Sequence, residues 1–285
     1  MYNSKLPRRL SWQISIPWLL GIFFGLLWIF PLYWMVATSL KPESQILSSI
    51  SLVPRPATIE HYLAVFRKAP MFTWFMNSVI VATSVTLGRL LLGSLTGYAL
   101  ARLHFPGRNL IFWLLVGSLM IPDELTVVPL FISVLRLNLD DTYVALILPA
   151  LSGAFSIFLY RQFFLTFPRE LEDAAAIDGC NRLQSFWHVV LPLARSVTLA
   201  GAILIFTDNW NDFLWPLLVA FHEEWKTLPV GAASFNTLNF QQTSNQFGYG
   251  PAMAAMVIVA LPTLLFFLLM QRYFIQGIIQ TGIKG

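Results

Sequence analysis

The chain has 285 residues, of which 56% are apolar and 11% charged, against roughly 45–50% and about 25% in ordinary soluble domains. A soluble domain cannot bury that much apolar surface, and the composition also excludes intrinsic disorder. The net charge of +4 does not indicate a nucleic-acid partner, because the basic residues are scattered between apolar runs. One cysteine, Cys180, and four isolated histidines provide neither a disulfide framework nor metal-ligand spacing. The sequence predicts a membrane protein without a metal site.

Six apolar segments are long enough to cross a membrane as helices, which takes about 20 residues each. They cover roughly 16–40, 73–101, 110–131, 142–162, 196–220 and 251–271. Barrel strands would alternate in polarity over about ten residues, which these segments do not. The predicted fold class is therefore an all-α membrane protein, a six-transmembrane-helix bundle. We expect residues 1–15 to form an N-terminal segment and 16–285 one transmembrane domain.

The distribution of Lys and Arg predicts the orientation. Eleven lie on the side of the N-terminus and six on the other: Lys5, Arg8, Arg9, Arg102, Arg108, Arg161, Arg169, Arg182, Arg195, Arg272 and Lys284 against Lys41, Arg55, Arg67, Lys68, Arg136 and Lys226. Both termini are expected in the cytoplasm. Lys5, Arg8 and Arg9 precede an apolar stretch too long for a signal-peptide core, so it reads as a retained anchor.

The cytoplasmic segment 163–195 is predicted to contain a hairpin of two short helices. Acidic residues follow Pro168 in the first turn of the first helix, and Gly179 suits the turn after it. Asn181 and Gln184 can form a capping box at the second helix, which Pro192 should stop. An apolar stripe has helical spacing: Leu183, Phe186, Trp187 and Val190.

Such a hairpin could lie on lipid headgroups or dock onto a partner protein. Membrane-surface helices usually have a basic polar face, whereas the first helix here is acidic, which favours a basic groove on a partner. The residues predicted to dock are Glu170, Glu172, Asp173, Ala174, Ala175, Asp178, Gly179 and Phe186.

The spacing Asp-Ala-Ala-x3-Gly-x9-Val-x-Leu-Pro, from Asp173 to Pro192, resembles the EAA motif of permease subunits of bacterial ABC importers. Segments elsewhere resemble the carbohydrate-uptake branch, the MalG- and UgpE-like permeases: Phe30–Tyr33, Asn77–Ser78, Tyr98–Arg108, Trp210–Pro216, Thr227–Gly231 and Gln271–Gly277. One departure is Asp173, where the motif has the longer glutamate.

This resemblance implies a fold of the type I ABC importer (MetI-like) kind. It also implies partners: a second permease forming a heterodimer, two ATPase subunits that receive the hairpin, and an external solute-binding protein. ATP and Mg would be bound by the ATPase subunits, and this chain would bind no cofactor. No Gly-rich phosphate loop of the Walker type occurs in the sequence, so we expect no ATPase site of its own.

Polar residues inside the predicted spans are costly to insert and therefore face a cavity or pair with one another. Asp208, Asn209, Asn211 and Asp212 in the fifth span form a candidate substrate path. The alternative is a structural ion pair, for instance with Arg89 in the second span. The pairs Gly21/Gly25 and Gly93/Gly97 predict close helix packing.

The outer loop 221–250 is longer than a connection needs. Its amides and aromatics suit contact with a wet protein surface or a sugar, and in the maltose-type relatives the corresponding loop reaches into the binding protein. Candidate contacts are Phe235, Asn236, Asn239, Phe240 and Gln241. The alternative is a solvated connector.

We therefore expect a non-catalytic permease subunit of an ATP-driven importer of a sugar or polyol, located in the inner (plasma) membrane. A self-sufficient proton-coupled secondary transporter is the main alternative, although such carriers often have internal repeats and none is evident here. A membrane-embedded enzyme is the third reading, for which no catalytic constellation was found.

Overall fold

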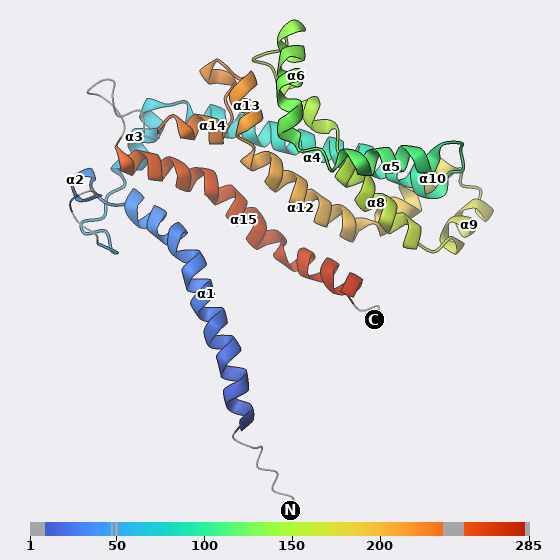
Figure 1. Cartoon of the computed structure of the whole chain (residues 1–285), viewed down its shortest axis with the longest axis horizontal. Helices are drawn as coiled ribbons and strands as arrows, with labels where there is room; N and C mark the ends of the chain where they lie inside the picture. The colour runs from blue at the N-terminus through green and yellow to red at the C-terminus, as the bar shows by residue number, and fades with distance from the viewer. Residues whose placement is uncertain (1–8, 47, 49–50, 236–247, 283–285) are drawn as a thin grey trace, which may run out of the picture. The chain divides into compact units, whose positions relative to one another are not determined.

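The computed structural model describes residues 9–46, 48, 51–235 and 248–282, and all regular structure within these ranges is helical (Figure 1). The longer helices are α1 (Arg9–Ser39), α3 (Glu60–Lys68), α4 (Met71–Arg102), α5 (Arg108–Ser118), α6 (Asp123–Arg136), α8 (Ala154–Thr166), α9 (Glu170–Ile177), α12 (Arg195–Asn211) and α15 (Tyr249–Gly282). Shorter ones are α2 (Glu43–Ile46), α7 (Tyr143–Ile147), α10 (Arg182–Ser185), α11 (Leu191–Leu193), α13 (Leu214–Val219) and α14 (Leu228–Ala233). Single turns η1 (Pro149–Leu151), η2 (Phe186–Val190) and η3 (Glu223–Trp225) complete the set.

The chain forms two compact units. The first contains Met1–Ala69 and Ala232–Ile258, and the second contains Pro70–Gly231 and Val259–Gly285. In the first unit, His61 Nε2 lies 2.7 Å from the Lys41 carbonyl oxygen. The Glu43 carboxylate accepts hydrogen bonds of 2.8 and 3.0 Å from the backbone N–H groups of Tyr249 and Gly250, at the start of α15. This carboxylate therefore caps the positive end of a long helix.

Within the described residues, three helices are long and apolar enough to cross a membrane: Pro17–Ser39, Met71–Arg102 and Tyr249–Leu269. Three further pairs of helices pass the same test if each bent pair is one span, which gives up to six. The expected six-helix membrane fold is thus confirmed in class. Some of the expected single helices are wrong, because these spans are broken.

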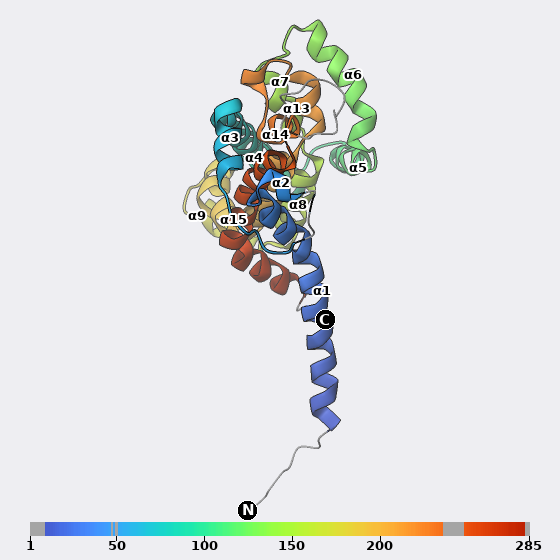
Figure 2. The ribbon, with the colours of Figure 1, turned by 90° about the vertical axis from the view of Figure 1, so that its left-hand side faces the viewer.

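The breaks fall at recognisable residues. The expected helix 110–131 is replaced by α5 and α6, which meet at 96° (Figure 2), and Pro122 at the start of α6 disfavours helix in the residue before it. The expected helix 142–162 is bent by 40° before Ala154, next to Gly153. The expected helix 196–220 ends at Asn211 and resumes at Leu214 as α13.

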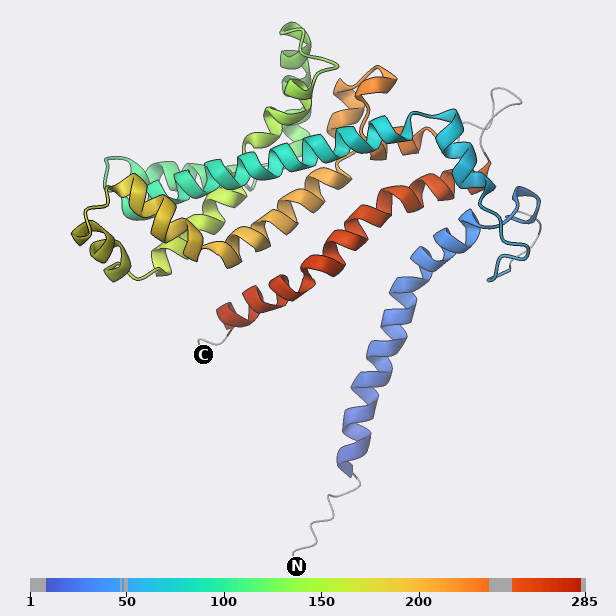
Figure 3. The same ribbon diagram turned by 180° about the vertical axis from the view of Figure 1, so that it is seen from behind.

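The second unit is organised around α4, which packs along α8 and α12 (Figure 3). Small residues allow this approach: a Cβ on Gly97 would lie 2.8 Å from the Tyr160 Cβ and 2.9 Å from the Arg161 backbone nitrogen. A Cβ on Gly93 would lie 2.5 Å from the Ser156 Oγ. The packing role predicted for these two glycines is confirmed. Gly21 and Gly25 in α1 meet no described atom of their own unit within 4 Å.

Part of the expected outer loop is folded onto the start of α4. Trp74 donates its indole N–H to the Glu223 carbonyl oxygen at 2.8 Å. The Asn77 amide donates to the carbonyl oxygens of Glu224 and Lys226 at 2.8 and 2.9 Å. Residues 223–226 are therefore held by buried side chains, which the polar composition of the loop did not indicate.

Candidate functional site: the helical hairpin after α8 and the polar surface of α12

The hairpin expected within 163–195 is present as α9 followed by α10. Gly179 has a φ of +87°, and the backbone N–H groups of Gly179 and Cys180 donate to the carbonyls of Ala176 and Ala175. This pattern is a Schellman motif, in which a left-handed residue ends a helix. Asn181 and Gln184 form the reciprocal capping box, with hydrogen bonds of 2.8 and 2.9 Å. The predicted turn and cap are confirmed.

The second helix ends at Leu193, one residue after Pro192, and the chain then bends by 75° into α12. The predicted end at Pro192 is therefore confirmed to within one residue. Between α10 and α11, residues Phe186–Val190 form a π-turn, which changes the register of the apolar stripe. Phe186 and Val190 are buried, whereas Leu183 and Trp187 are exposed. The stripe therefore does not form one buried face.

Glu172 holds the hairpin against the end of α4. Its carboxylate forms an ion pair of 2.8 Å with Arg102 and accepts a hydrogen bond of 3.0 Å from the Tyr98 hydroxyl. Arg102 also donates to the Phe167 carbonyl oxygen at 2.5 Å. The Tyr98 ring packs against Phe186, with ring centroids 5.2 Å apart. These contacts fix the position of both hairpin helices relative to α4.

The structure divides the candidate docking residues into two groups. Glu172 and Phe186 contact the end of α4, and Ala175 is buried. The exposed members are Glu170, Asp173, Ala174, Asp178 and Gly179. Sequence reasoning missed Ile177, which is 87% exposed between Asp173 and the turn. The signal was available, since an isoleucine closing an otherwise acidic and alanine-rich helix has no obvious place in its core.

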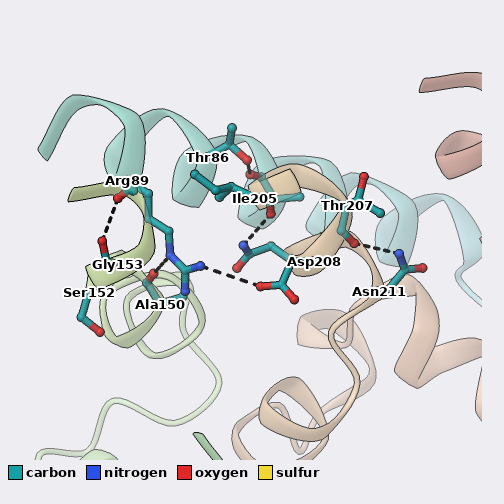
Figure 4. A network of polar contacts seen from close by, with 12 residues as sticks. Thr86, Arg89, Ala150, Ser152, Gly153, Ile205, Thr207, Asp208 and Asn211 are labelled. Carbon is teal, nitrogen blue, oxygen red and sulfur yellow. Dashed lines mark hydrogen bonds and ion pairs between the residues drawn. The ribbon is translucent and has the colours of Figure 1, made fainter. Parts of the chain in front are cut away.

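The polar residues of the fifth span gather around α12 (Figure 4). Arg89 of α4 donates to the Ala150 carbonyl oxygen and lies 3.8 Å from the Asp208 carboxylate, whose side chain is 76% exposed. Asn209 and Asn211 donate their amides to the carbonyls of Ile205 and Thr207, one turn earlier in the helix. The ion pair considered for Arg89 is therefore present.

Asp208, Asn211 and Asp212 share one face of the α12 end, because they are spaced three and four residues apart. Asp208 and Asn211 are exposed and Asp212 is half-buried. Asn209 lies beside this face and is half-buried. The arrangement presents carboxylate and amide oxygens together, which can accept hydrogen bonds from a hydroxylated solute.

Five residues of the loop 221–250 were predicted to contact a binding protein, and one of them, Phe235, is described in the structure. Phe235 is 1% exposed, so its ring is part of a core in the structure. Asn236, Asn239, Phe240 and Gln241 lie outside the described residues.

A second polar contact missed by sequence reasoning joins His222 to Asp141. The carboxylate accepts hydrogen bonds from the His222 backbone N–H at 3.0 Å and meets its ring Nδ1 at 2.5 Å. The bond to Asp141 and its charge raise the pKa of His222 above 6.5. Burial favours a higher pKa for Asp141, but the hydrogen bonds from His222 outweigh it, so the Asp141 pKa is lowered. The pair therefore joins the segment around Asp141 to the segment around His222.

Taken with its spans, this site defines a helical integral membrane protein that presents a rigid hairpin beyond the end of one spanning helix. Among the described residues, no group of three or more His, Cys, Asp or Glu side chains could hold a metal ion. Residues 89–280 match the family described as "Binding-protein-dependent transport system inner membrane component". The chain belongs to this family of inner-membrane transport components and is a multi-pass membrane protein.

Several characterised proteins are similar to the chain over nearly its whole length. The arabinooligosaccharides transport system permease protein AraQ of Halalkalibacterium halodurans is 38% identical over 99% of this chain and 100% of its own. The sn-glycerol-3-phosphate transport system permease protein UgpE of Yersinia pestis is 34% identical over 90% of this chain and 92% of its own.

The fold has a solved counterpart. A chain of a bacterial ABC transporter involved in the import of the acidic polysaccharide alginate superposes with a TM-score of 0.83 at 21% identity, covering 95% of this chain and 100% of that one. This likeness concerns the fold alone.

Proposed function

We propose that this chain is one of two permease subunits of an ATP-binding-cassette importer and forms half of the transmembrane pathway for a sugar or sugar-like polyol. Relatives whose names specify arabinooligosaccharide and glycerol-3-phosphate transport support this solute class. The second permease, two ATPase subunits carrying ATP and Mg, and an external solute-binding protein complete the complex. The N- and C-termini are cytoplasmic, which places the hairpin on the side of the ATPases.

The observation that carries the proposal is the exposed surface of the fixed hairpin. Asp173, Asp178 and Ile177 project from α9, while Glu172 and Phe186 anchor the hairpin from within. A partner groove can therefore bury Ile177 and pair with the two carboxylates while the hairpin keeps its fold. Because the hairpin is already ordered, docking does not have to offset the entropy cost of folding it. A hairpin fixed in this way can pass a movement of the partner on to α4.

The acids and amides around Arg89 are the proposed lining of the solute path. The Arg89–Asp208 pair reduces the cost of a charge inside the membrane, and Asp212, Asn209 and Asn211 leave oxygens for solute hydroxyls. The same polar groups would also suit a proton-coupled transporter, so they do not distinguish the two energy sources. The docking hairpin is the feature that favours an ATPase partner.

The docking proposal is tested by Ile177→Ser combined with Asp173→Lys. We expect the permease to reach the membrane but to lose the ATPase subunit that copurifies with the wild type, because an apolar anchor and a favourable charge are both removed. Leu110→Ser is the matched control, since Leu110 is also exposed and apolar but belongs to α5. Retention of the ATPase at wild-type stoichiometry in the double variant, or uptake driven by a proton gradient alone, would refute the proposal.

The outer loop is tested by deleting residues 236–245. The complex should still assemble with its ATPase, because these residues lie far along the chain from the hairpin. Stimulation of ATP hydrolysis by the loaded binding protein should fall sharply. Unchanged stimulation and uptake would show that the segment is a passive connector.

A further inference from the structure

A pocket of about 280 Å³ lies between the hairpin and the end of α4. Arg102 and His104 line it from the end of α4 and the residues after it, and Arg169, Arg182 and Ser185 line it from the hairpin. Liquid water takes about 30 Å³ per molecule, so the pocket has room for a phosphate group and part of what carries it. Figures 1 and 3 show the hairpin helices beside this end of α4.

The lining of the pocket has an excess of positive charge. The charge of Glu172 is neutralised by Arg102, and the Tyr98 hydroxyl donates a hydrogen bond to the same carboxylate. Arg169 and Arg182 take part in none of the ion pairs between described residues. Asp173 is the remaining acid of the lining and balances one of these two guanidinium groups. A net positive charge of one remains.

One buried hydroxyl of the pocket lacks a partner. Ser185 lines the pocket and is 5% exposed, and its Oγ has no hydrogen-bond partner among the described residues. An unsatisfied buried hydroxyl is unfavourable, and an oxygen acceptor on a ligand would satisfy it. The pocket therefore offers two guanidinium groups and one hydroxyl donor, the combination that suits phosphate oxygens.

We propose that this pocket binds a phosphate-bearing anion, a role separate from the subunit docking and the solute path proposed above. Its place favours a phospholipid headgroup: α4 is a candidate membrane span that ends at Arg102, so the pocket begins where the apolar part of the helix stops. Basic pockets beside the end of a membrane helix are suited to anionic headgroups. Soluble phosphate is the other source of the same chemistry.

Binding is measured on the full chain, purified in detergent with the subunits that accompany it. The midpoint of thermal unfolding is followed with dihexanoyl phosphatidylglycerol, dihexanoyl phosphatidylcholine or inorganic phosphate at constant ionic strength, because a ligand that binds the native state raises the midpoint. A rise with phosphatidylglycerol alone identifies a headgroup, and a rise with inorganic phosphate as well identifies soluble phosphate. If the midpoint rises with none of the three compounds, the proposal is overturned.

The double variant Arg169→Gln/Arg182→Gln should weaken binding about tenfold or more, since each charge-assisted hydrogen bond contributes substantially. Arg55→Gln/Arg136→Gln is the control, with the same change of charge outside the pocket. Ser185→Ala should weaken binding severalfold without lowering the midpoint in the absence of ligand, because its hydroxyl has no partner to lose, and it replaces the double variant if that variant does not fold. Equal binding by pocket and control variants would overturn the proposal.

Discussion

Gly179 turns the chain between α9 and α10 with a φ of +87°, a conformation that side chains with a branched Cβ strongly disfavour. We expect Gly179→Val to destabilise the hairpin by about 1–3 kcal/mol. The effect is conformational rather than steric, because a Cβ at this position meets no atom within 4 Å. Hydrogen exchange of the α9 and α10 amides measures it.

Gly179→Asn is the matched variant, since asparagine tolerates the left-handed region better than valine does. It should restore most of the protection lost in Gly179→Val. If both variants exchange like the wild type, the positive φ is not a requirement of the turn. In the proposed complex, the valine variant should also hydrolyse ATP without transport or fail to assemble.

The His222–Asp141 pair should make the segments around these two residues sensitive to pH. Because the pKa of His222 is raised in the folded protein, the charged pair is fully formed below pH 6.5. It weakens as the pH rises through the higher pKa that His222 has in the folded state. The lowered pKa of Asp141 means that the pair is complete above 3.8 and weakens as the pH falls through the lower folded value. Loop protection should therefore be greatest between these limits.

Hydrogen exchange of residues 138–142 across this range, referred to the intrinsic rate at each pH, tests the pair. His222→Gln retains the backbone N–H that bonds Asp141 but removes the titrating ring, so the loss of protection on the alkaline side should disappear. An unchanged alkaline loss in the glutamine variant would assign it to another group.

The contact between α4 and α8 depends on Gly97. A larger side chain there meets backbone atoms of α8 that cannot move aside, so Gly97→Leu should separate the helices and cost about 1–3 kcal/mol or more. Unfolding in increasing SDS measures the loss. Gly117→Leu in α5 is the control, because a Cβ there meets nothing within 4 Å. Equal resistance of both variants would contradict the packing argument.

Features encoded within a few residues were predictable from the sequence. The capping box at Asn181, the turn at Gly179 and the small residues of α4 each depend on local chemistry, and each is confirmed. The break before α6 could have been read from Pro122, which was instead absorbed into one long apolar run.

Contacts between distant residues could not be predicted. Arg102 and Glu172 are 70 positions apart. Nothing in the sequence around either residue shows that these two, among the other charged residues, form an ion pair. The π-turn at Phe186–Val190 has the same origin: it places Phe186 and Val190 in a core shared with residues of α4 and α8. The predicted stripe was therefore divided between core and surface.

The arrangement of the whole chain in the membrane is tested by chemical labelling. A cysteine introduced at Ser48 should react with an impermeant thiol reagent added outside intact cells, because the positive-inside rule places it externally. A cysteine at Gln242 should behave in the same way, while native Cys180 should be protected. Labelling of Cys180 from outside would reverse the proposed orientation.

Helix α4 has 32 residues with no proline after its start, which corresponds to about 48 Å of continuous helix. At one end, Trp74 and Asn77 form hydrogen bonds with residues 223–226. At the other end, Tyr98 and Arg102 bind Glu172 of the hairpin. Because α4 is one continuous helix bonded at both ends, we expect a displacement of residues 223–226 to move the hairpin as well.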